Sequence, residues 1–256
     1  MTRLLLLGGT SEASQLAQRL AQDAIGAIFS YAGRTRAPAS QPLPMRIGGF
    51  GGINGLAEYI RTKHISHVID ATHPFAAQIS HNAIAACAQT NTPLLSYQRA
   101  PWQAGPDDAW CHVPDINAAL AALPEPPARI FLAIGKQQLG VFARKPQHHY
   151  LVRLVDPPTT PLPLSNAQIV IARGPFTQPE DTALMRTHEI THIIAKNSGG
   201  AGAKAKLLAA RTLGLPVIMV DRPDMAARDI RDSVEGVMDW LADHDVAPPS
   251  GALRGV

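Results

Sequence analysis

Short apolar runs alternate with amphipathic stretches through the first hundred residues. The runs that we expect to form strands lie at 4–7, 27–31, 45–47, 67–71 and 94–97. Between them, apolar residues recur at helical spacing, as they do from Ala13 to Ala24. Strands and helices in strict alternation are typical of a parallel sheet that helices cover on both faces.

The alternation is interrupted once and then resumes. Residues 99–112 are rich in Pro, Gly and Asp, which is typical of a linker. Further strands are predicted at 130–134, 150–155, 169–172, 193–195 and 217–220, and a last helix carries Ile230, Val234, Val237 and Leu241. We therefore expect an α/β fold of two Rossmann-like domains, at 1–98 and 113–246, whose mostly parallel sheets face a central cleft, with a flexible tail at 247–256.

Composition and charge exclude several classes of protein. Of the 256 residues, 46% are hydrophobic and 17% are charged, and no apolar run is long enough to span a bilayer. The N-terminal apolar segment is too short for a secretory signal, so we expect a cytoplasmic protein, a monomer or small homo-oligomer, without a membrane partner. The net charge of +3 forms no concentrated basic face, which argues against nucleic acid. Cys87 and Cys111 lack the spacing of a metal or redox site, and we expect no metal.

A glycine turn follows the first expected strand. Gly8 and Gly9 allow a tight turn, Thr10 and Ser11 add hydroxyl groups, and Ala13 permits close packing of the next helix. A dinucleotide-binding fold needs small residues here, because the backbone and the helix N-terminus approach a pyrophosphate. The motif is not G-x-G-x-x-G, since Thr10 takes the place of the second glycine. An ordinary strand–helix turn is the alternative.

The residues after the second expected strand favour one cofactor. An acidic residue at this point binds the ribose 2′-hydroxyl of NAD, whereas a basic residue accommodates the 2′-phosphate of NADP. Here the strand ends in Ala32 and Gly33, and Arg34 and Thr35 follow. Arg34 can bind a phosphate through two hydrogen bonds, and Thr35 can add a hydroxyl group. We therefore expect NADPH or NADP; a solvent-exposed arginine in a turn is the alternative.

Two further turns are expected to contact the cofactor. The loop at 48–52 has four glycines around Phe50, and we expect Phe50 and Gly51 near the adenine side, with a flexible connection as the alternative. The segment that follows the fourth strand lies near the nicotinamide in this topology and contains Thr72, His73, Pro74 and Phe75. His73 can hydrogen-bond a ribose or a carboxylate, or supply a proton. A capping residue before Pro74 is the stronger alternative to a catalytic acid.

Four strands of the second half each end near a cation. These cations are Lys136, Arg173, Lys196 and Arg222. Ligands of open parallel sheets bind at the carboxyl ends of the strands, so this pattern predicts an anionic ligand. The alternative is that each cation only solvates the edge of the sheet.

A glycine-rich turn follows Lys196. Asn197, Ser198, Gly199 and Gly200 lead into an expected helix that carries Lys204. Such a turn exposes amide groups toward an anion, and a helix N-terminus adds to the field. The spacing is not that of a P-loop, and we expect the turn to hold a carboxylate or a phosphate.

The segment His188–His192 matches H-E-x-x-H, the signature of zinc proteases. That signature requires both imidazoles on one face of a single helix. The β-branched residues from Ile190 to Ile194 indicate a strand instead, in which the two rings lie too far apart to bind one ion. We therefore expect no zinc site here.

The motifs LGGTSEA, GGFGG, VIDATHPFA, ARGPF and KNSGGAGAKAKLLAARTLGLPV together resemble the precorrin-6A reductase family of cobalamin biosynthesis, from about Leu4 to Arg222. The resemblance implies an NADPH-dependent oxidoreductase that reduces one double bond of a corrin precursor, precorrin-6A, to precorrin-6B. It implies two Rossmann-like domains with the cofactor and the tetrapyrrole between them. The family includes forms that act on a cobalt-containing macrocycle.

The resemblance also implies the site residues. It places the cofactor on Gly8, Gly9, Thr10, Glu12, Arg34 and the turn 72–75. It places the polycarboxylated tetrapyrrole against Lys136, Arg173, Lys196 and Lys204, with amide groups from the turn 198–200. Solvent, or a protonated group near His73, would supply the proton. Two alternatives remain, namely an NADPH-dependent reductase of a small carbonyl substrate, with a Ser/Tyr/Lys relay, and a non-catalytic NADPH-binding module.

Overall fold

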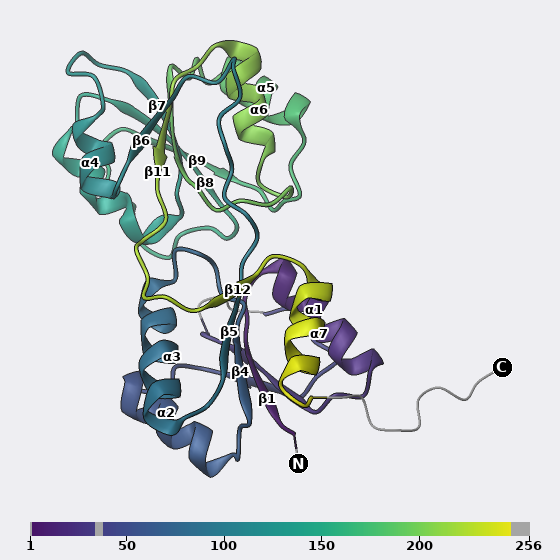
Figure 1. The fold of residues 1–256 in the computed structure, drawn as a ribbon. Helices are drawn as coiled ribbons and strands as arrows, with labels where there is room; N and C mark the ends of the chain where they lie inside the picture. Colours follow the sequence, from purple (N-terminus) through teal and green to yellow (C-terminus); the bar gives the residue numbers. More distant parts are fainter. Residues whose placement is uncertain (1, 34–37, 247–256) are drawn as a thin grey trace. The chain divides into compact units, whose positions relative to one another are not determined.

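The computed structural model describes residues 2–33 and 38–246. The chain divides into two compact units (Figure 1), of which the first comprises Met1–Arg99 with Asp224–Val256 and the second comprises Ala100–Pro223. Each unit is built on one six-stranded sheet in which every neighbouring pair of strands is parallel. The predicted α/β fold class is confirmed.

The sheet of the first unit has the strand order β12-β5-β4-β1-β2-β3. Its strands are β1 (Leu4–Leu7), β2 (Ala27–Tyr31), β3 (Met45–Ile47), β4 (His67–Asp70), β5 (Leu94–Tyr97) and β12 (Asp229–Arg231). Its helices are α1 (Ser11–Gln22), α2 (Gly52–Thr62), α3 (Ala77–Thr90) and α7 (Val234–Asp243). Helices α1 and α7 cover one face of the sheet, and α2 and α3 cover the other (Figure 1).

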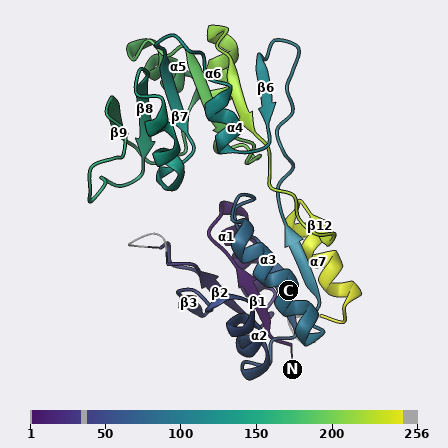
Figure 2. The same cartoon turned by 90° about the vertical axis from the view of Figure 1, so that its left-hand side faces the viewer.

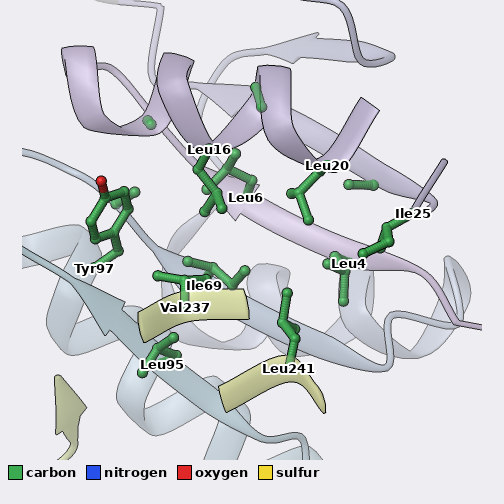
Figure 3. Packing of buried hydrophobic residues seen from close by; sticks show 14 of the residues in the cluster. Leu4, Leu6, Leu16, Leu20, Ile25, Ile69, Leu95, Tyr97, Val237 and Leu241 are labelled. Carbon is green, nitrogen blue, oxygen red and sulfur yellow. The ribbon is translucent and has the colours of Figure 1, made fainter. Parts of the chain in front are cut away.

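The central strand β1 is buried on both faces. Leu4 and Leu6 pack in the cluster that contains Leu16 of α1 and Leu241 of α7 (Figure 3). Leu5 and Leu7 belong to the cluster on the opposite face, with α2 and α3. Side chains alternate between the faces of a strand, so a run of four leucines serves two cores at once.

The sheet of the second unit has the strand order β6-β11-β10-β7-β8-β9. Its strands are β6 (Trp110–Val113), β7 (Arg129–Ala133), β8 (His149–Leu154), β9 (Ala167–Ile171), β10 (His192–Lys196) and β11 (Val217–Val220). Its helices are α4 (Ile116–Ala121), the 3-10 helix η1 (Lys136–Arg144), α5 (Gln178–Thr187) and α6 (Ala205–Leu213). Helices α5 and α6 pack together over one face, on Phe131, Ile193 and Ala195.

The course of the chain between the units differs from the expected domain boundaries. Residues 224–246 do not join the second unit, because β12 pairs with β5 (Figure 2) and α7 packs beside α1 in the first unit (Figure 1). Ile230 lies on β12 and not on the expected helix, which begins at Val234. The expected linker 99–112 contains most of β6, which pairs with β11. Each sheet therefore ends in a short edge strand that the apolar pattern did not mark.

Among the described residues, no helix is long and apolar enough to cross a membrane.

Candidate functional site

The turn after β1 is bound to the turn after β4. Thr10 is the N-cap of α1, and its hydroxyl accepts a hydrogen bond from the amide of Ala13 at 3.1 Å. The same hydroxyl donates to the carbonyl of Ala71 at 2.8 Å. Because both turns follow neighbouring parallel strands, these bonds fix two adjacent loops at the carboxyl edge of the sheet.

Glycine is required at positions 8 and 9 for different structural reasons, at Gly8 by lack of space and at Gly9 by backbone conformation. A Cβ atom on Gly8 would lie 2.1 Å from the ring of Phe29, so no side chain fits there. Gly9 has a φ of +127°, a conformation that other residues rarely adopt, and space is open beside its Cα. The amides of Gly9 and Ser11 have no hydrogen-bond partner in the described part of the chain. Backbone donors at the N-terminus of a helix, beside open space, suit an anion such as a pyrophosphate.

Glu12 is paired with Arg99. Its two carboxylate oxygens each accept a hydrogen bond from Arg99 Nη1, at 3.0 Å. Burial raises the pKa of Glu12, but the hydrogen bonds from its own backbone and from Arg99 outweigh this effect and hold the pKa below its ordinary value. The pair links the end of β5 to the first turn of α1, where a negative charge is favourable. Glu12, expected to contact the cofactor, therefore also has a structural role.

The end of β2 contains no acid. Ala32 and Gly33 are exposed, and Gly33 has a φ of +76°. The expected phosphate-binding residues Arg34 and Thr35 lie outside the described residues. What the structure does place at this edge is Arg46 of β3, whose side chain donates to Ser30 Oγ of β2 at 2.9 Å. Arg46 was not among the residues expected from the sequence, because a single arginine in a three-residue strand gives no signal.

The loop after β3 is shaped by Arg46. The guanidinium donates to the carbonyls of Gly48 at 2.9 Å and Gly49 at 3.0 Å, and lies 3.8 Å from the centre of the Phe50 ring. Gly48 and Gly51 have positive φ values of 124° and 83°, and Gly51 is the N-cap of α2. The loop of four glycines thus has a defined conformation rather than that of an unconstrained connection.

The turn after β4 is organised by Asp70. This carboxylate is buried and accepts hydrogen bonds from the amide and the hydroxyl of Thr72, at 3.1 and 2.6 Å, and from Ser80 Oγ at 2.5 Å. Pro74 is buried and His73 is exposed. The turn is therefore rigid at its base, and His73 projects from it.

His73 does not cap a helix. Helix α3 begins at Ala77 with Ala76 as its N-cap. Instead, His73 Nδ1 accepts a hydrogen bond from the amide of Phe75 at 3.2 Å. A neutral imidazole that accepts at Nδ1 carries its proton on Nε2, so in this state Nε2 is a donor and not an acceptor.

In the second unit, the expected cations follow strands that end at one edge. Lys136 is exposed after β7, and Arg173 is exposed after β9, 3.8 Å from the Asp156 carboxylate. Lys196 is the last residue of β10 and is half-buried, and burial lowers its pKa. Because all strands of this sheet are parallel, the three side chains share its carboxyl edge.

The turn after Lys196 is held from within. Asn197 is buried, and its side chain accepts from the amide of Trp102 at 2.7 Å and donates to the carbonyl of Trp102 at 3.0 Å. These bonds favour a structural role for Asn197 over the expected substrate contact. Gly200 accepts from Trp102 Nε1 at 2.7 Å. A Cβ atom on Gly199 would lie 2.1 Å from the carbonyl oxygen of Ala100, so this position requires glycine.

The remaining residues of this turn lead into α6. Ser198 is buried, and its carbonyl accepts from Arg222 Nη2 at 3.2 Å. Arg222 also donates to the carbonyl of Asn197 at 3.0 Å, so this cation supports the turn. Lys204 is exposed and does not lie within α6 as expected, because the helix begins one residue later, at Ala205.

A cavity of about 180 Å³ lies at the carboxyl edge of the same sheet. Arg153 of β8 and Asp181 of α5 form a buried ion pair in its wall, with 2.7 Å between Nη2 and Oδ1. Burial raises the pKa of Asp181, although Arg153 opposes this effect. Phe176 lies against the guanidinium, 3.9 Å from it, and Lys206 also lines the cavity. The sequence did not mark Arg153, because it is the only charged residue of an otherwise apolar strand end.

The H-E-x-x-H segment does not form one helix. His188 is the C-cap of α5, and His192 is the first residue of β10. Their Nδ1 atoms have separate partners, Gln168 at 3.0 Å and Thr191 at 2.9 Å. In the described part of the chain, no group of three or more potential ligands is arranged to hold a metal ion.

Tyr59 and Lys63 have the Tyr-x-x-x-Lys spacing found in the proton relays of small-carbonyl reductases. Tyr59 packs edge-on against Phe50, with 5.2 Å between the rings. Lys63 follows the end of α2, and its carbonyl accepts from Arg3, which precedes β1. Lys63 therefore lies at the amino edge of the sheet, away from the glycine turns, and this pair does not form a relay at the candidate site.

Comparison with known proteins gives consistent matches over nearly the whole chain. The family model described as precorrin-6x reductase CbiJ/CobK matches residues 3–242. A precorrin-6A reductase of Rhodobacter capsulatus is 65% identical over 97% of this chain and 99% of its own length. A cobalt-precorrin-6A reductase of Priestia megaterium is 30% identical over 93% of this chain and 97% of its own. A solved structure, CobK precorrin-6A reductase, superposes with a TM-score of 0.93 at 65% identity, over 97% of this chain and 99% of that one.

Proposed function

The chain belongs to the precorrin-6x reductase family, and from this premise we propose that it catalyses the NADPH-dependent reduction of precorrin-6A to precorrin-6B in cobalamin biosynthesis. Relatives that carry the name precorrin-6A reductase, at 65% and 44% identity, support the choice of substrate. The observation that supports the cofactor is the combination of a glycine turn with open amides and a second strand that ends without an acid.

The first unit would bind NADPH along the carboxyl edge of its sheet. The turn Gly8–Thr10 and the first turn of α1, from Ser11 to Ala13, would hold the pyrophosphate, because the amides of Gly9 and Ser11 have no partner among the described residues and space is open beside Gly9. Gly33, Arg34 and Thr35 would bind the 2′-phosphate, and Phe50 and Gly51 would lie near the adenosine. The turn Thr72–Phe75 follows the neighbouring strand β4, so it would lie toward the nicotinamide.

The second unit would bind the tetrapyrrole through its peripheral carboxylates. Lys136, Arg173 and Lys196 share one edge of the sheet, and Lys204 follows in the adjoining turn. The amides of the turn Ser198–Gly200 would add backbone donors, while Asn197 would keep the turn in place. The cavity beside Arg153 has aromatic walls, but the guanidinium is already paired with Asp181, so we assign no carboxylate arm to it.

The reaction requires a hydride, which bound NADPH supplies to an electron-poor carbon of the macrocycle. The residues of the chain orient and desolvate the reacting groups. His73 would donate its Nε2–H to a ribose or substrate oxygen near the reacting carbon. Protonation of His73 at Nδ1 would break the hydrogen bond from Phe75, so we assign the proton for the neighbouring carbon to solvent.

We also propose a cellular compartment and an oligomeric state for the enzyme. Cys87 and Cys111 are both free, which is consistent with a reducing compartment such as the cytoplasm. We propose a monomer or a small homo-oligomer, and light scattering on the purified protein would determine which.

An absorption experiment tests the function. The protein is incubated with precorrin-6A and NADPH, and the spectrum of the macrocycle is followed, with NADH and a cofactor-free sample as controls. Loss of one conjugated double bond should shift the absorption bands with NADPH and much more slowly with NADH. An unchanged spectrum with competent substrate and NADPH would refute the proposal.

A further inference from the structure

We propose that Arg46 is a second cation, besides Arg34, that selects NADP over NAD by placing a fixed positive charge at the end of β2. The inference rests on the proposed use of NADPH and deepens it. It concerns a residue of β3 that follows Arg34 by twelve positions and that the sequence did not mark as a phosphate ligand.

The position of Arg46 follows from the register of the sheet. Ser30 and Arg46 are direct partners in the parallel pairing of β2 and β3. Their side chains meet, with Arg46 Nη1 donating to Ser30 Oγ at 2.9 Å. The end of β2 is where an NAD-binding fold carries the acid that binds the ribose 2′-hydroxyl. Here the end of that strand has a serine hydroxyl and a guanidinium in place of a carboxylate.

The guanidinium is held in one orientation. Its Nη1 and Nη2 atoms donate to the carbonyls of Gly48 and Gly49, and its carbon lies 3.8 Å from the centre of the Phe50 ring. A guanidinium has five N–H groups, and the bonds to Ser30 and to these two carbonyls use three of them. The Nε–H and one Nη2–H have no partner among the described residues. A planar group with two donors left over suits a phosphate.

The charge of Arg46 is not compensated. Arg99 pairs with Glu12 and Arg153 pairs with Asp181, so two other half-buried arginines each have a carboxylate partner. Arg46 is half-buried, yet every group to which it donates in the described structure is a neutral oxygen. A half-buried cation whose protein partners are all neutral has lost part of its hydration, so an anion that binds beside it restores a favourable partner for the charge. The 2′-phosphate of NADP is an anion of suitable charge for this edge of the sheet.

The same contacts give Arg46 a positioning role, and the two roles predict different outcomes. If Arg46 only shaped the glycine loop, its removal would weaken NADP⁺ and NAD⁺ alike, because both carry the same adenosine. If Arg46 also contacts the 2′-phosphate, its removal weakens the binding of NADP⁺ much more than the binding of NAD⁺. The ratio of the two affinities therefore separates the roles.

The experiment measures the dissociation constants of NADP⁺ and NAD⁺ by calorimetry for the wild type, Arg46→Met and Arg46→Lys. We expect Arg46→Met to weaken NADP⁺ by about tenfold to a hundredfold, which is the usual effect of losing a charged hydrogen bond. The dissociation constant of NAD⁺ should change by less than about threefold, since NAD⁺ has no 2′-phosphate and so no such charged hydrogen bond to lose. Arg46→Lys keeps the charge and loses the planar fork, so its loss for NADP⁺ should be intermediate.

Arg61→Met is the matched control. It removes one positive charge from an exposed position near the end of α2, where the single hydrogen bond of the Arg61 side chain to the described residues goes to the carbonyl of Gln89, at 3.4 Å. Its NADP⁺ affinity should equal that of the wild type. Circular dichroism checks that each variant is folded. If Arg46→Met does not fold, the comparison is made with Arg46→Lys instead.

Equal losses for NADP⁺ and NAD⁺ in both Arg46 variants, or no loss for either, would overturn the inference. A wild type that binds no NADP⁺ would overturn it together with the proposed cofactor. A wild type that binds NADP⁺ and shows the Arg46 effect but does not reduce precorrin-6A would refute the proposed reaction and leave the role of Arg46 supported.

Discussion

The hydroxyl of Thr10 lies between two turns, donating to the carbonyl of Ala71 and accepting from the amide of Ala13. One side chain thereby caps α1 and fixes the turn after β1 against the turn after β4. In the proposed function these turns bind the pyrophosphate and approach the nicotinamide. The stability of α1 and the affinity for the cofactor therefore depend on the same hydroxyl group.

Thr10→Val should lower both the stability of the protein and its affinity for the cofactor. Valine has nearly the shape of threonine but cannot cap, so we expect a loss of about 1 kcal/mol in the free energy of unfolding, measured by urea denaturation. The Michaelis constant for NADPH should rise. Ser233→Ala, which removes the N-cap of α7, is the matched control, because it should cost similar stability without altering the Michaelis constant. A rise of the same size in that control would show that the effect is one of general stability.

Arg34 lies outside the described residues, so its role depends on a solution test. Arg34→Ala should raise the Michaelis constant for NADPH by about tenfold or more, because a charged hydrogen bond to the phosphate is lost. The constant for NADH should stay nearly unchanged. Steady-state kinetics with both cofactors measures this, and equal changes would contradict the assignment.

His73 is expected to act as a hydrogen-bond donor. His73→Ala should lower kcat, while His73→Asn, which retains an N–H donor, should recover part of the loss. Steady-state kinetics at one pH measures kcat for both variants. A kcat that is equally low in His73→Ala and His73→Asn would contradict a donor role for the ring.

His148 makes stability depend on pH. The ring is fully buried, its Nδ1 accepts from the amide of Ala128 at 3.1 Å, and its Nε2 has no partner among the described residues. Burial lowers the pKa of His148, and the nearby Lys145 and His192 lower it further, whereas Glu125 raises it.

The direction of the effect follows from proton binding. The unfolded chain binds the proton near the ordinary histidine pKa of 6.5, and the folded chain binds it only at lower pH. The contribution of His148 to the free energy of unfolding should therefore be constant above pH 6.5. It should fall as the pH drops below that value, until the folded ring is protonated as well. Urea denaturation from neutral to mildly acidic pH measures the slope, and His148→Phe should reduce it. An unchanged slope in that variant would exclude His148 as the cause.

The sequence predicts the apolar strands well, because β1, β4, β10 and β11 are short apolar runs that must be covered on both faces. It does not predict β12, a strand of three residues with two charges that pairs with β5, more than 130 positions earlier. Nothing local marks such a pairing, so the assignment of 224–246 to the first unit came only from the structure.

The candidate site divides in the same way. The glycine turns and the strand-end cations are visible in the sequence, because their backbone conformations and positions require particular residue types. Arg46 and the pair of Arg153 with Asp181 are not, because their roles arise from the register between strands and from packing against α5. Asn197 has the residue type of a ligand, but its partner Trp102 is far away in the sequence and was therefore not foreseen.

The proposed function depends on transfer of a hydride from NADPH to the precorrin macrocycle, and an isotope label on the cofactor follows that transfer. Precorrin-6A is incubated with the protein and NADPH that carries deuterium at the transferable position of the nicotinamide, and the product is analysed by mass spectrometry. We expect a reduced macrocycle that contains one carbon-bound deuterium from the cofactor. Recovery of unreduced macrocycle, or of a reduced product without the label, would contradict it.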